Sequence, residues 1–361
     1  MFEFDLQLFA QGGGTVTNAT GNYVNAYTGD TTAFSGTNTL TPTMKEYYDT
    51  ELLENARDEL IFQQFGRKQT LPANHGKVVE WRKWNTLPDV DKLTEGVIPD
   101  GKKLGMTSQT VEIAQYGEYV SVTDQLDLHA IDDVILGATE ELGAAAGKSY
   151  DKLVRNVLME NTVVLYADAY TAAGAYSATP SSRADLLTKS ATLQCYLTPD
   201  MVAKAVTKLR KLNAPYFQGN KYVAVVHPSC VYDLRKSTDW LDAHKYASPE
   251  EIFNGEIGEL HGVRFVESNL APVIKSDGNA VYQTMFFGKD AYAVVDPAGA
   301  GMETIIHDKT EAGGPLNQFS TVGAKFSMAA KILYPERMLA VESCSSYGSD
   351  DEDNTAAIGN A

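Results

Sequence analysis

The stretch from Gly76 to Asp124 constrains the fold more than any other part of this chain. Two runs within it, 77–84 and 110–124, alternate apolar and polar residues, which is the pattern of strands that bury one face. The polar connection between the two runs is far longer than the roughly 2–5 residues of a common hairpin loop. An isolated two-stranded ribbon is at best marginally stable in water. We therefore expect a neighbouring subunit to cover this arm, which predicts a protein that assembles.

The amino terminus carries a second candidate docking segment. Phe2, Phe4, Leu6 and Leu8 alternate with polar residues, and residues 11–43 are rich in Gly, Thr, Asn and Ala. Such a composition buries too little apolar surface to offset the entropy of ordering. We expect a flexible arm whose first residues dock as a strand on a neighbour. Pairing of that strand within its own subunit is an equally good alternative.

Composition excludes several classes of protein. A net charge of −17 makes direct binding to duplex DNA a poor prediction, because such binding places Lys and Arg on phosphates. Three scattered cysteines are too few for a disulfide framework or a zinc site. No apolar run approaches the roughly 18–20 residues of a membrane span, and acidic residues interrupt the first ten residues, unlike a signal peptide. No cofactor or metal is expected.

Periodicity predicts alternating helices and strands over the rest of the chain. The longest helical pattern covers 130–160, and 166–194 is read as an irregular link. Thr198-Pro199-Asp200 has the residues of a helix start. Further predicted elements are a helix over 44–65, strands at 222–226, 261–268, 282–287, 291–295 and 302–307, a helix from Pro228 to Lys236, a hairpin of 324–334 with 337–343, and an acidic disordered tail after Ser346.

Two residue sets could carry catalysis. His227 and Cys230 could form a Cys/His nucleophile pair, but no neighbouring motif supports one, and a turn fixed by Pro228 at a helix start is the preferred interpretation. The acids Asp132-Asp133 and Glu140-Glu141 fit a solvated helix face better than an acid/base pair. The chain is therefore predicted not to be an enzyme.

Two further sets could bind a ligand. Gly299-Ala300-Gly301 lacks the remaining residues of a phosphate loop and is read as a turn. Trp81 and Trp84, beside Arg82 and Lys83, could stack single-stranded nucleic acid, but the charge of −17 favours packing or subunit contact.

The arm also carries a family resemblance. A strand is followed by Leu93-Thr94-Glu95-Gly96-Val97-Ile98-Pro99-Asp100-Gly101, then by Gln115-Tyr116-Gly117-Glu118-Tyr119 and a closing Asp124. This order resembles the major capsid proteins of the N4-like family of tailed phages, which are similar in fold to the Hong Kong 97 type of coat protein. The resemblance continues through roughly residues 44–346.

The resemblance implies an α+β fold of the Hong Kong 97-like type. Its expected parts are a peripheral domain with a long spine helix and a β-hairpin, an axial α/β domain, an extended loop and an N-terminal arm. The corresponding segments are 1–43 (arm), 44–75 (N-terminal helix region), 76–124 (extended loop), 125–194 with 324–346 (peripheral domain), 195–323 (axial domain) and 347–361 (tail).

The implied function is that of a structural coat protein that assembles as hexamers and pentamers into an icosahedral head around double-stranded phage DNA. The virion is the expected location, with host cytoplasm during assembly. Scaffold, portal and decoration proteins are further candidate partners, and no sequence-specific DNA contact or membrane is expected. The expected inter-subunit contact residues are Phe2, Phe4, Leu6, Leu8, Trp81, Trp84, Leu93, Glu95, Val97 and Ile98.

Alternatives remain at this point. An encapsulin-like shell around an enzyme would keep the fold and change the cargo. A β-rich carbohydrate-active enzyme would need a carboxylate pair in a cleft, which the sequence does not show. A portal or scaffold protein would be dominated by helix.

Overall fold

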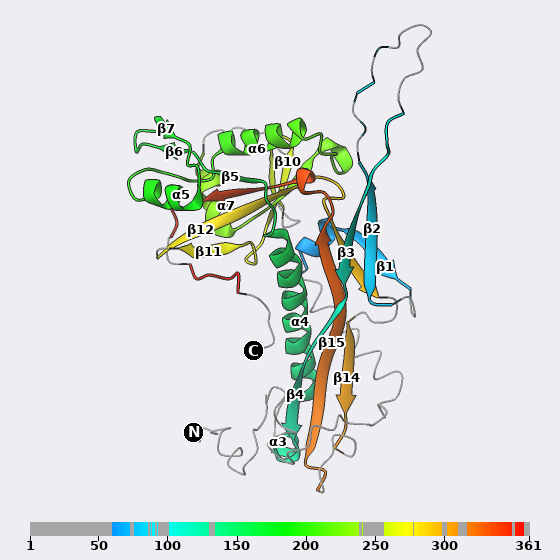
Figure 1. Cartoon of the computed structure of the whole chain (residues 1–361). Helices are drawn as coiled ribbons and strands as arrows, with labels where there is room; N and C mark the ends of the chain where they lie inside the picture. The colour runs from blue at the N-terminus through cyan, green and yellow to red at the C-terminus, as the bar shows by residue number, and fades with distance from the viewer. Residues whose placement is uncertain are drawn as a thin grey trace.

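The structure is a computed structural model, and it describes residues 60–72, 76–85, 87, 89–90, 92, 101–129, 134–237, 240, 256–276, 278–297, 302–309, 316–348 and 351–356. The described chain forms two large sheets, a long helix beside one of them, a two-stranded ribbon that projects from the body, and a small pair of short strands (Figure 1). Most of the predicted helix 44–65 lies outside the described residues, which begin just before a short 3₁₀ turn, η2 (Phe62–Phe65).

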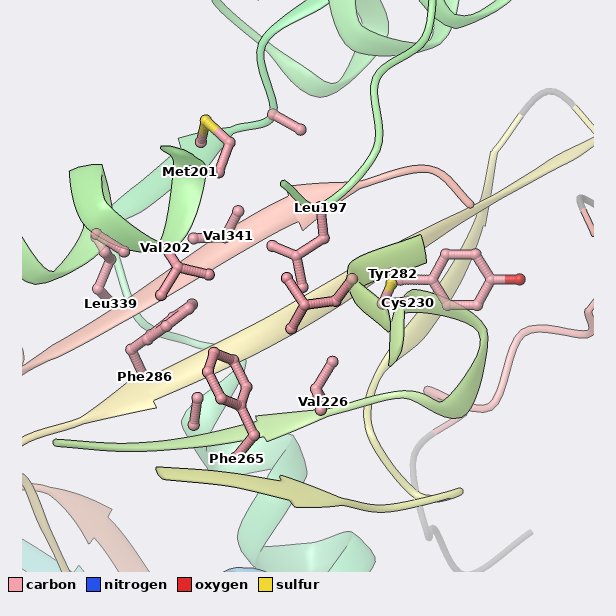
Figure 2. Close-up of a cluster of buried hydrophobic side chains, with 14 of the residues drawn as sticks. Leu197, Met201, Val202, Val226, Cys230, Phe265, Tyr282, Phe286, Leu339 and Val341 are labelled. Atoms are coloured by element: carbon pink, nitrogen blue, oxygen red, sulfur yellow. The ribbon is translucent and has the colours of Figure 1, made fainter. Parts of the chain in front are cut away.

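A seven-stranded mixed sheet forms one half of the body. Its order is β5 (Val164–Tyr166), β16 (Met338–Ser343), β12 (Asn279–Phe287), β8 (Tyr222–Val226), β10 (Val263–Glu267) and β9 (Glu256–Leu260), with β11 (Val273–Ser276) also paired to β12. Helices α5 (Arg183–Ser190), α6 (Pro199–Lys211) and α7 (Pro228–Lys236) pack their apolar faces into the same core as this sheet. Figure 2 shows Met201 and Val202 of α6 facing Leu339 and Val341 of β16.

Local sequence explains where α6 and α7 begin. The Thr198 hydroxyl accepts a hydrogen bond from the Met201 amide, and Pro199 occupies the first turn of α6. In α7 the N-cap is His227, whose Nδ1 accepts from the Ser229 amide, and Pro228 follows. Both predicted helices and the strand at 222–226 are confirmed.

The second half of the body is a long helix against a five-stranded sheet. Helix α4 (Val134–Leu158) runs beside β15 (Phe319–Ile332) and β4 (Ala114–Thr123) (Figure 1). The sheet order is β1 (Arg67–Leu71), β13 (Tyr292–Pro297), β15 and β14 (Glu303–His307), and β4 also pairs with β15. The predicted long helix is thus confirmed within 130–160.

The predicted hairpin of 324–334 with 337–343 was wrong. Strand β15 pairs with β13, β14 and β4, whereas β16 pairs with β12 and β5 in the other sheet. A 3₁₀ turn, η5 (Pro335–Arg337), passes the chain from one sheet to the other. The physical reason is burial: all six residues of β16 are buried, which requires neighbouring strands on both edges and cover on both faces.

The second run of the arm, 110–124, is two strands rather than one. Strand β3 (Met106–Glu112) pairs antiparallel with β2 (Val78–Trp84), and beyond Ile113 the chain enters β4 and leaves the ribbon. A short helix, α3 (Asp124–His129), follows β4. The predicted strand 77–84 is therefore confirmed as β2. The predicted strand 110–124 is confirmed within the ribbon only at 110–112, because β3 begins earlier, at Met106, and the rest of the run belongs to the body.

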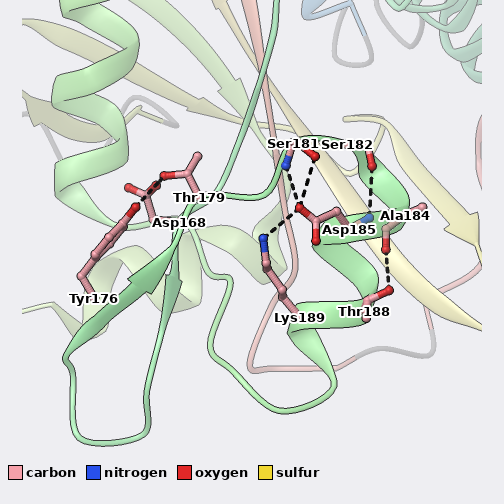
Figure 3. Close-up of polar contacts among 9 residues, drawn as sticks. All are labelled: Asp168, Tyr176, Thr179, Ser181, Ser182, Ala184, Asp185, Thr188 and Lys189. Atoms are coloured by element: carbon pink, nitrogen blue, oxygen red, sulfur yellow. Dashed lines mark hydrogen bonds and ion pairs between the residues drawn. The ribbon is translucent and has the colours of Figure 1, made fainter.

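The predicted irregular link 166–194 contains regular structure. Strands β6 (Ala169–Tyr170) and β7 (Tyr176–Ala178) pair, and α5 follows. The Ser182 hydroxyl accepts from the Asp185 amide, and the Asp185 carboxylate accepts from the Ser181 amide at 2.8 Å, as Figure 3 shows. This reciprocal capping lets a short polar segment form a helix.

Residues 351–356 of the predicted disordered tail lie against the body and form hydrogen bonds with it, so the prediction of disorder was wrong for this part.

Strands β13 and β14, from the predicted axial segment 195–323, pair within the sheet beside α4, whereas β5 and β16 join the seven-stranded sheet. The predicted boundaries therefore do not coincide with the sheets, and the domain division stays a prediction.

Candidate assembly surfaces

The two faces of the β2–β3 ribbon have different surroundings. Directly opposite residues share a face, and the register pairs Val79 with Val111 and Trp84 with Met106. The face that carries Val79 is turned to the body, and the face that carries Trp84 is turned to solvent. The ribbon thus offers one anchoring face and one free face.

The anchoring face holds the ribbon to the body. Val79 is buried with Val295 of β13 and Ala329 of β15, and Leu71, Trp81, Val111 and Ile113 pack around them. The Trp81 indole Nε1–H donates to Gln69 Oε1 at 2.6 Å. These contacts fix the direction in which the ribbon leaves the sheet.

Charged contacts add a second attachment near the end of β2. The Lys83 ammonium lies 2.5 Å from a Glu336 carboxylate oxygen and 4.5 Å from the centre of the Tyr334 ring. The Arg337 guanidinium lies 3.8 Å from the same ring. The turn that links the two sheets therefore also contacts the ribbon.

The free face is unusually apolar towards its outer end. Trp84 is 62% exposed, and its cross-strand partner Met106 is 47% exposed. Leu87, Val90 and Leu104 are exposed nearby in sequence. Trp84 and Met106 form an exposed apolar pair across the two strands, which makes this end of the free face a candidate contact site for another protein.

The ten predicted contact residues divide into three groups. Trp84 is exposed on the free face, so it is available to a partner. Trp81 packs on its own chain and bonds Gln69, so its surroundings do not favour a contact with another subunit. The other eight, Phe2, Phe4, Leu6, Leu8, Leu93, Glu95, Val97 and Ile98, lie outside the described residues.

A groove lies between β4 and α4. It has a volume of about 520 Å³ and is lined mainly by small or aromatic residues, among them Ala114, Tyr116, Ala145, Ala146 and Phe326. Tyr116 stacks on Phe326 with ring centres 5.6 Å apart, which forms an aromatic floor. The groove is a shallow surface into which an apolar side chain could fit.

A buried carboxylate on α4 attaches the segment before β1, and sequence reasoning missed it. Asp151 Oδ1 accepts hydrogen bonds from the amides of Ile61, Phe62 and Gln63, at 3.1, 2.7 and 3.3 Å. Burial raises the pKa of Asp151 to about 7, against the lowering effect of these N–H groups. The only sequence signal is an acid within the apolar stripe of a long helix.

The candidate catalytic pair does not form an activated nucleophile. Cys230 is fully buried, and burial raises the pKa of its thiol to about 12. His227 caps α7 through Nδ1, and its pKa is lowered by burial. Both residues therefore have structural roles.

The remaining sequence candidates are described only in part. Glu140 and Glu141 are exposed on α4, whereas 132–133 and 299–301 lie outside the described residues. Arg82 pairs with Glu80, and Lys83 with Glu336, so both cations of the basic-aromatic cluster are neutralised.

Among the described residues no group of three or more His, Cys, Asp or Glu side chains is placed to hold a metal. No helix in that part of the chain is both long and apolar enough to cross a membrane.

Comparison with known proteins gives a consistent result. A family model described as phage capsid protein matches residues 107–336. No curated protein sequence matches this chain.

Solved structures of similar fold include the acid-stable capsid of Helicobacter pylori bacteriophage KHP30, at 11% identity and a TM-score of 0.58, with 77% of this chain and 87% of that chain covered. The capsid of Ralstonia phage GP4 shows 16% identity and a TM-score of 0.56, with 78% and 87% covered. A structure from Mycobacterium phage Che8 shows 19% identity and a TM-score of 0.54, with 79% and 90% covered.

The family match spans the ribbon strand β3, helix α4 and most of both sheets, and the similarity in fold extends over more than three quarters of the chain. The chain therefore belongs to the phage capsid protein family, and it is a structural protein of a capsid shell.

Proposed function

We propose that this chain is the major capsid protein of a tailed phage, of the N4-like family, and that its copies close as hexamers and pentamers into an icosahedral head around double-stranded DNA. The observation that carries the proposal is the projecting ribbon, anchored on one face and bearing the exposed apolar pair Trp84 and Met106 at the outer end of the other, in a chain of the capsid family. A monomer gains nothing from such a ribbon, whereas a neighbouring subunit can bury its free face.

The parts of a Hong Kong 97-type subunit can be assigned on this basis. The β2–β3 ribbon is the extended loop, α4 with the five-stranded sheet is the peripheral domain, and the seven-stranded sheet with its helices is the axial domain. The assignment is supported by the length of α4 and by the way the ribbon leaves the sheet beside it. Residues 1–43 remain the proposed N-terminal arm.

The contact that we propose joins the free face of one ribbon to the β4–α4 groove of the next subunit. Trp84 and Met106 supply apolar surface, and the small side chains of Ala114, Ala145 and Ala146 leave room for them. Burying such side chains gives roughly 1.5–3 kcal/mol each, repeated over every subunit contact in a shell. The residues at 2–8 and 93–98 are proposed to make further contacts of this kind.

Charge bears on what the shell encloses. A chain of net charge −17 gains little from phosphate contacts. We therefore expect the shell to enclose the packaged DNA without sequence-specific contacts to it. Scaffold, portal and decoration proteins are proposed partners. The proposed locations are the virion and, during assembly, the host cytoplasm.

An encapsulin-like shell is the second candidate function, because it would use the same kind of fold. The match to a family described as phage capsid protein favours the phage head. The same match argues against a carbohydrate-active enzyme.

Negative-stain electron microscopy of the chain expressed alone, after size-exclusion chromatography, tests assembly. Closed shells or five- and six-fold rings are expected. A monomer or dimer that never assembles, on concentration or with a candidate scaffold, would contradict the proposal.

Disulfide trapping tests the specific contact. The double variant Trp84→Cys with Ala145→Cys should form covalent chains of subunits under oxidation once shells are present. The matched control pairs Trp84→Cys with Leu128→Cys, so that both double variants lack the Trp84 side chain; Leu128 is 77% exposed on α3, away from the ribbon. Equal crosslinking of the two double variants would exclude this contact while leaving shell formation untouched.

A further inference from the structure

The described part of the C-terminal tail lies along the outer edge of β11. Within the part of the chain that the structure describes, β11 pairs only with β12, so its other edge would present unpaired backbone groups without the tail. The amides of Val273 and Lys275 point to that edge, and tail side chains accept from them: Asn354 Oδ1 at 3.0 Å and Asp353 Oδ2 at 3.2 Å. The backbone N–H of Asn354 donates in turn to the backbone carbonyl of Val273 at 3.2 Å. The tail thus fills the place of a further strand.

A second contact fixes the start of this tail segment. Asp351 Oδ2 accepts hydrogen bonds from the Tyr282 hydroxyl at 2.5 Å and from the Ser229 hydroxyl at 3.0 Å. Figure 2 shows the Tyr282 ring extending from the apolar core with its hydroxyl at the outer end. The hydrogen bond from Tyr282 lowers the pKa of Asp351, so the carboxylate stays ionised at neutral pH.

A third contact couples the tail to the long helix. The Arg155 side chain of α4 is fully buried, and its guanidinium donates to the Asn354 carbonyl at 2.7 Å and to the Leu270 carbonyl at 3.0 Å. Removal of a partner from a buried charged group leaves the full desolvation cost unbalanced. Detachment of the tail would therefore be opposed by Arg155 as well as by the β11 edge.

We propose that residues 351–356 form a strap that occupies a strand-addition site on β11, and that a second copy of this chain adds a strand at that edge when the strap is detached. An open sheet edge is a template for pairing with another chain, because its N–H and C=O groups recognise backbone irrespective of sequence. The partner is a second copy because a shell protein meets its own copies at the highest local concentration. The strap covers the outer edge of β11, while the free face of the ribbon remains available for assembly.

The test compares two variants that remove the same charge from adjacent positions. Asp351→Asn weakens the contacts with Tyr282 and Ser229. Glu352→Gln changes an exposed side chain that forms no hydrogen bond or ion pair with the described residues. In the full chain, Asp351→Asn should raise amide hydrogen exchange at Val273 and Lys275 by about tenfold, as expected from loss of a charged hydrogen bond. It should also give irregular aggregates by size-exclusion chromatography with light scattering. Glu352→Gln should do neither.

A second-site change shows whether aggregation uses the β11 edge. Lys275→Pro removes an outward N–H and spares the β11–β12 pairing, as a proline on an edge strand does. Added to Asp351→Asn, it should abolish the irregular aggregates. Unchanged exchange in Asp351→Asn, raised exchange without aggregation, or aggregation that persists with Lys275→Pro would each overturn the proposal. Measurement of closed shells is a separate readout, so a failure here leaves the capsid function intact.

Discussion

Trp84 of β2 lies directly opposite Met106 of β3, and both side chains are exposed on the ribbon face turned away from the body. The opposite face of the same ribbon is buried around Val79. One short segment therefore carries two contacts with different roles: one holds the ribbon in place, and the other is free for a neighbour. The predictions below separate contributions to folding from contributions to assembly.

Trp84→Ala should impair assembly without destabilising the subunit. An exposed side chain contributes little to folding, whereas its burial in a subunit contact contributes roughly 1.5–3 kcal/mol at every copy. We expect an unchanged denaturation midpoint for the unassembled chain and a rise of at least about tenfold in the concentration needed for shells. Leu128→Ala serves as a control, because Leu128 on α3 is an apolar side chain even more exposed than Trp84. Equal effects of the two variants on assembly would argue against a specific role for Trp84.

Asp151→Asn should change how stability depends on pH. The folded-state pKa of Asp151 is about 7, above its ordinary value of 3.8, so between these limits the folded chain binds more protons than the unfolded chain. The contribution of Asp151 is therefore most favourable at low pH and is lost as the pH rises towards 7. The total loss is on the order of 4 kcal/mol, at about 1.4 kcal/mol for each pKa unit.

Urea denaturation from pH 4 to pH 8 measures this effect as the difference between the wild-type chain and Asp151→Asn. Asparagine keeps an oxygen that accepts from the amides of 61–63 and cannot ionise. The advantage of the wild type should shrink as the pH rises through this window. A constant difference, or one that grows with pH, would contradict the assigned pKa.

Two glycine substitutions should have opposite effects. A Cβ at Gly288 would lie 2.9 Å from the Pro215 carbonyl oxygen and 3.1 Å from that of Arg337. Both neighbours are backbone atoms that cannot move aside cheaply, so Gly288→Ala should destabilise the chain by about 1–3 kcal/mol. Gly137 lies within α4 with nothing within 4 Å of an added Cβ, so Gly137→Ala should stabilise it by up to about 1 kcal/mol.

Thermal and chemical denaturation of the two alanine variants provide the measurement, and each serves as the other's control. The same chemical change is made at a crowded and at an open position. Destabilisation by Gly137→Ala, or tolerance of Gly288→Ala, would show that local packing differs from the described contacts.

The three cysteines should resist thiol reagents in the folded chain. Cys195, Cys230 and Cys344 are buried, and burial raises the pKa of Cys195 to about 11 and that of Cys230 to about 12. Since the thiolate is the reactive form, a chromogenic disulfide reagent should modify none of them at pH 8 and all three in strong denaturant. Rapid reaction of Cys230 in the folded chain would contradict its assignment as a buried structural residue and would support a nucleophile at this position.

Local features of the sequence determined several elements correctly. Thr198-Pro199 and His227-Pro228 place the starts of α6 and α7, because capping groups and the fixed proline φ act within a few residues. Alternation predicted β2 and the last residues of β3, and spacing of three to five predicted α4. The ordered motifs around the arm also led to the capsid family, which the match over residues 107–336 confirms.

Other features depended on contacts between distant parts of the chain. Strands β15 and β16 looked like a hairpin because they are adjacent in sequence, but the burial of β16 on all sides is satisfied only inside another sheet. Trp81 and Trp84 belong to one pattern in the sequence, yet only the position of Gln69 and Val295 makes one an anchor and leaves the other free. Asp351 is a further case: its sequence context predicts an acidic disordered tail, but the fold places Tyr282 and Ser229 where their hydroxyl groups donate to its carboxylate. Periodicity and capping are set within a few residues of the chain, so the sequence determined them; strand partners, the free face of the ribbon and the docking of the tail were decided by the tertiary structure, because each depends on which distant surface is left to be buried.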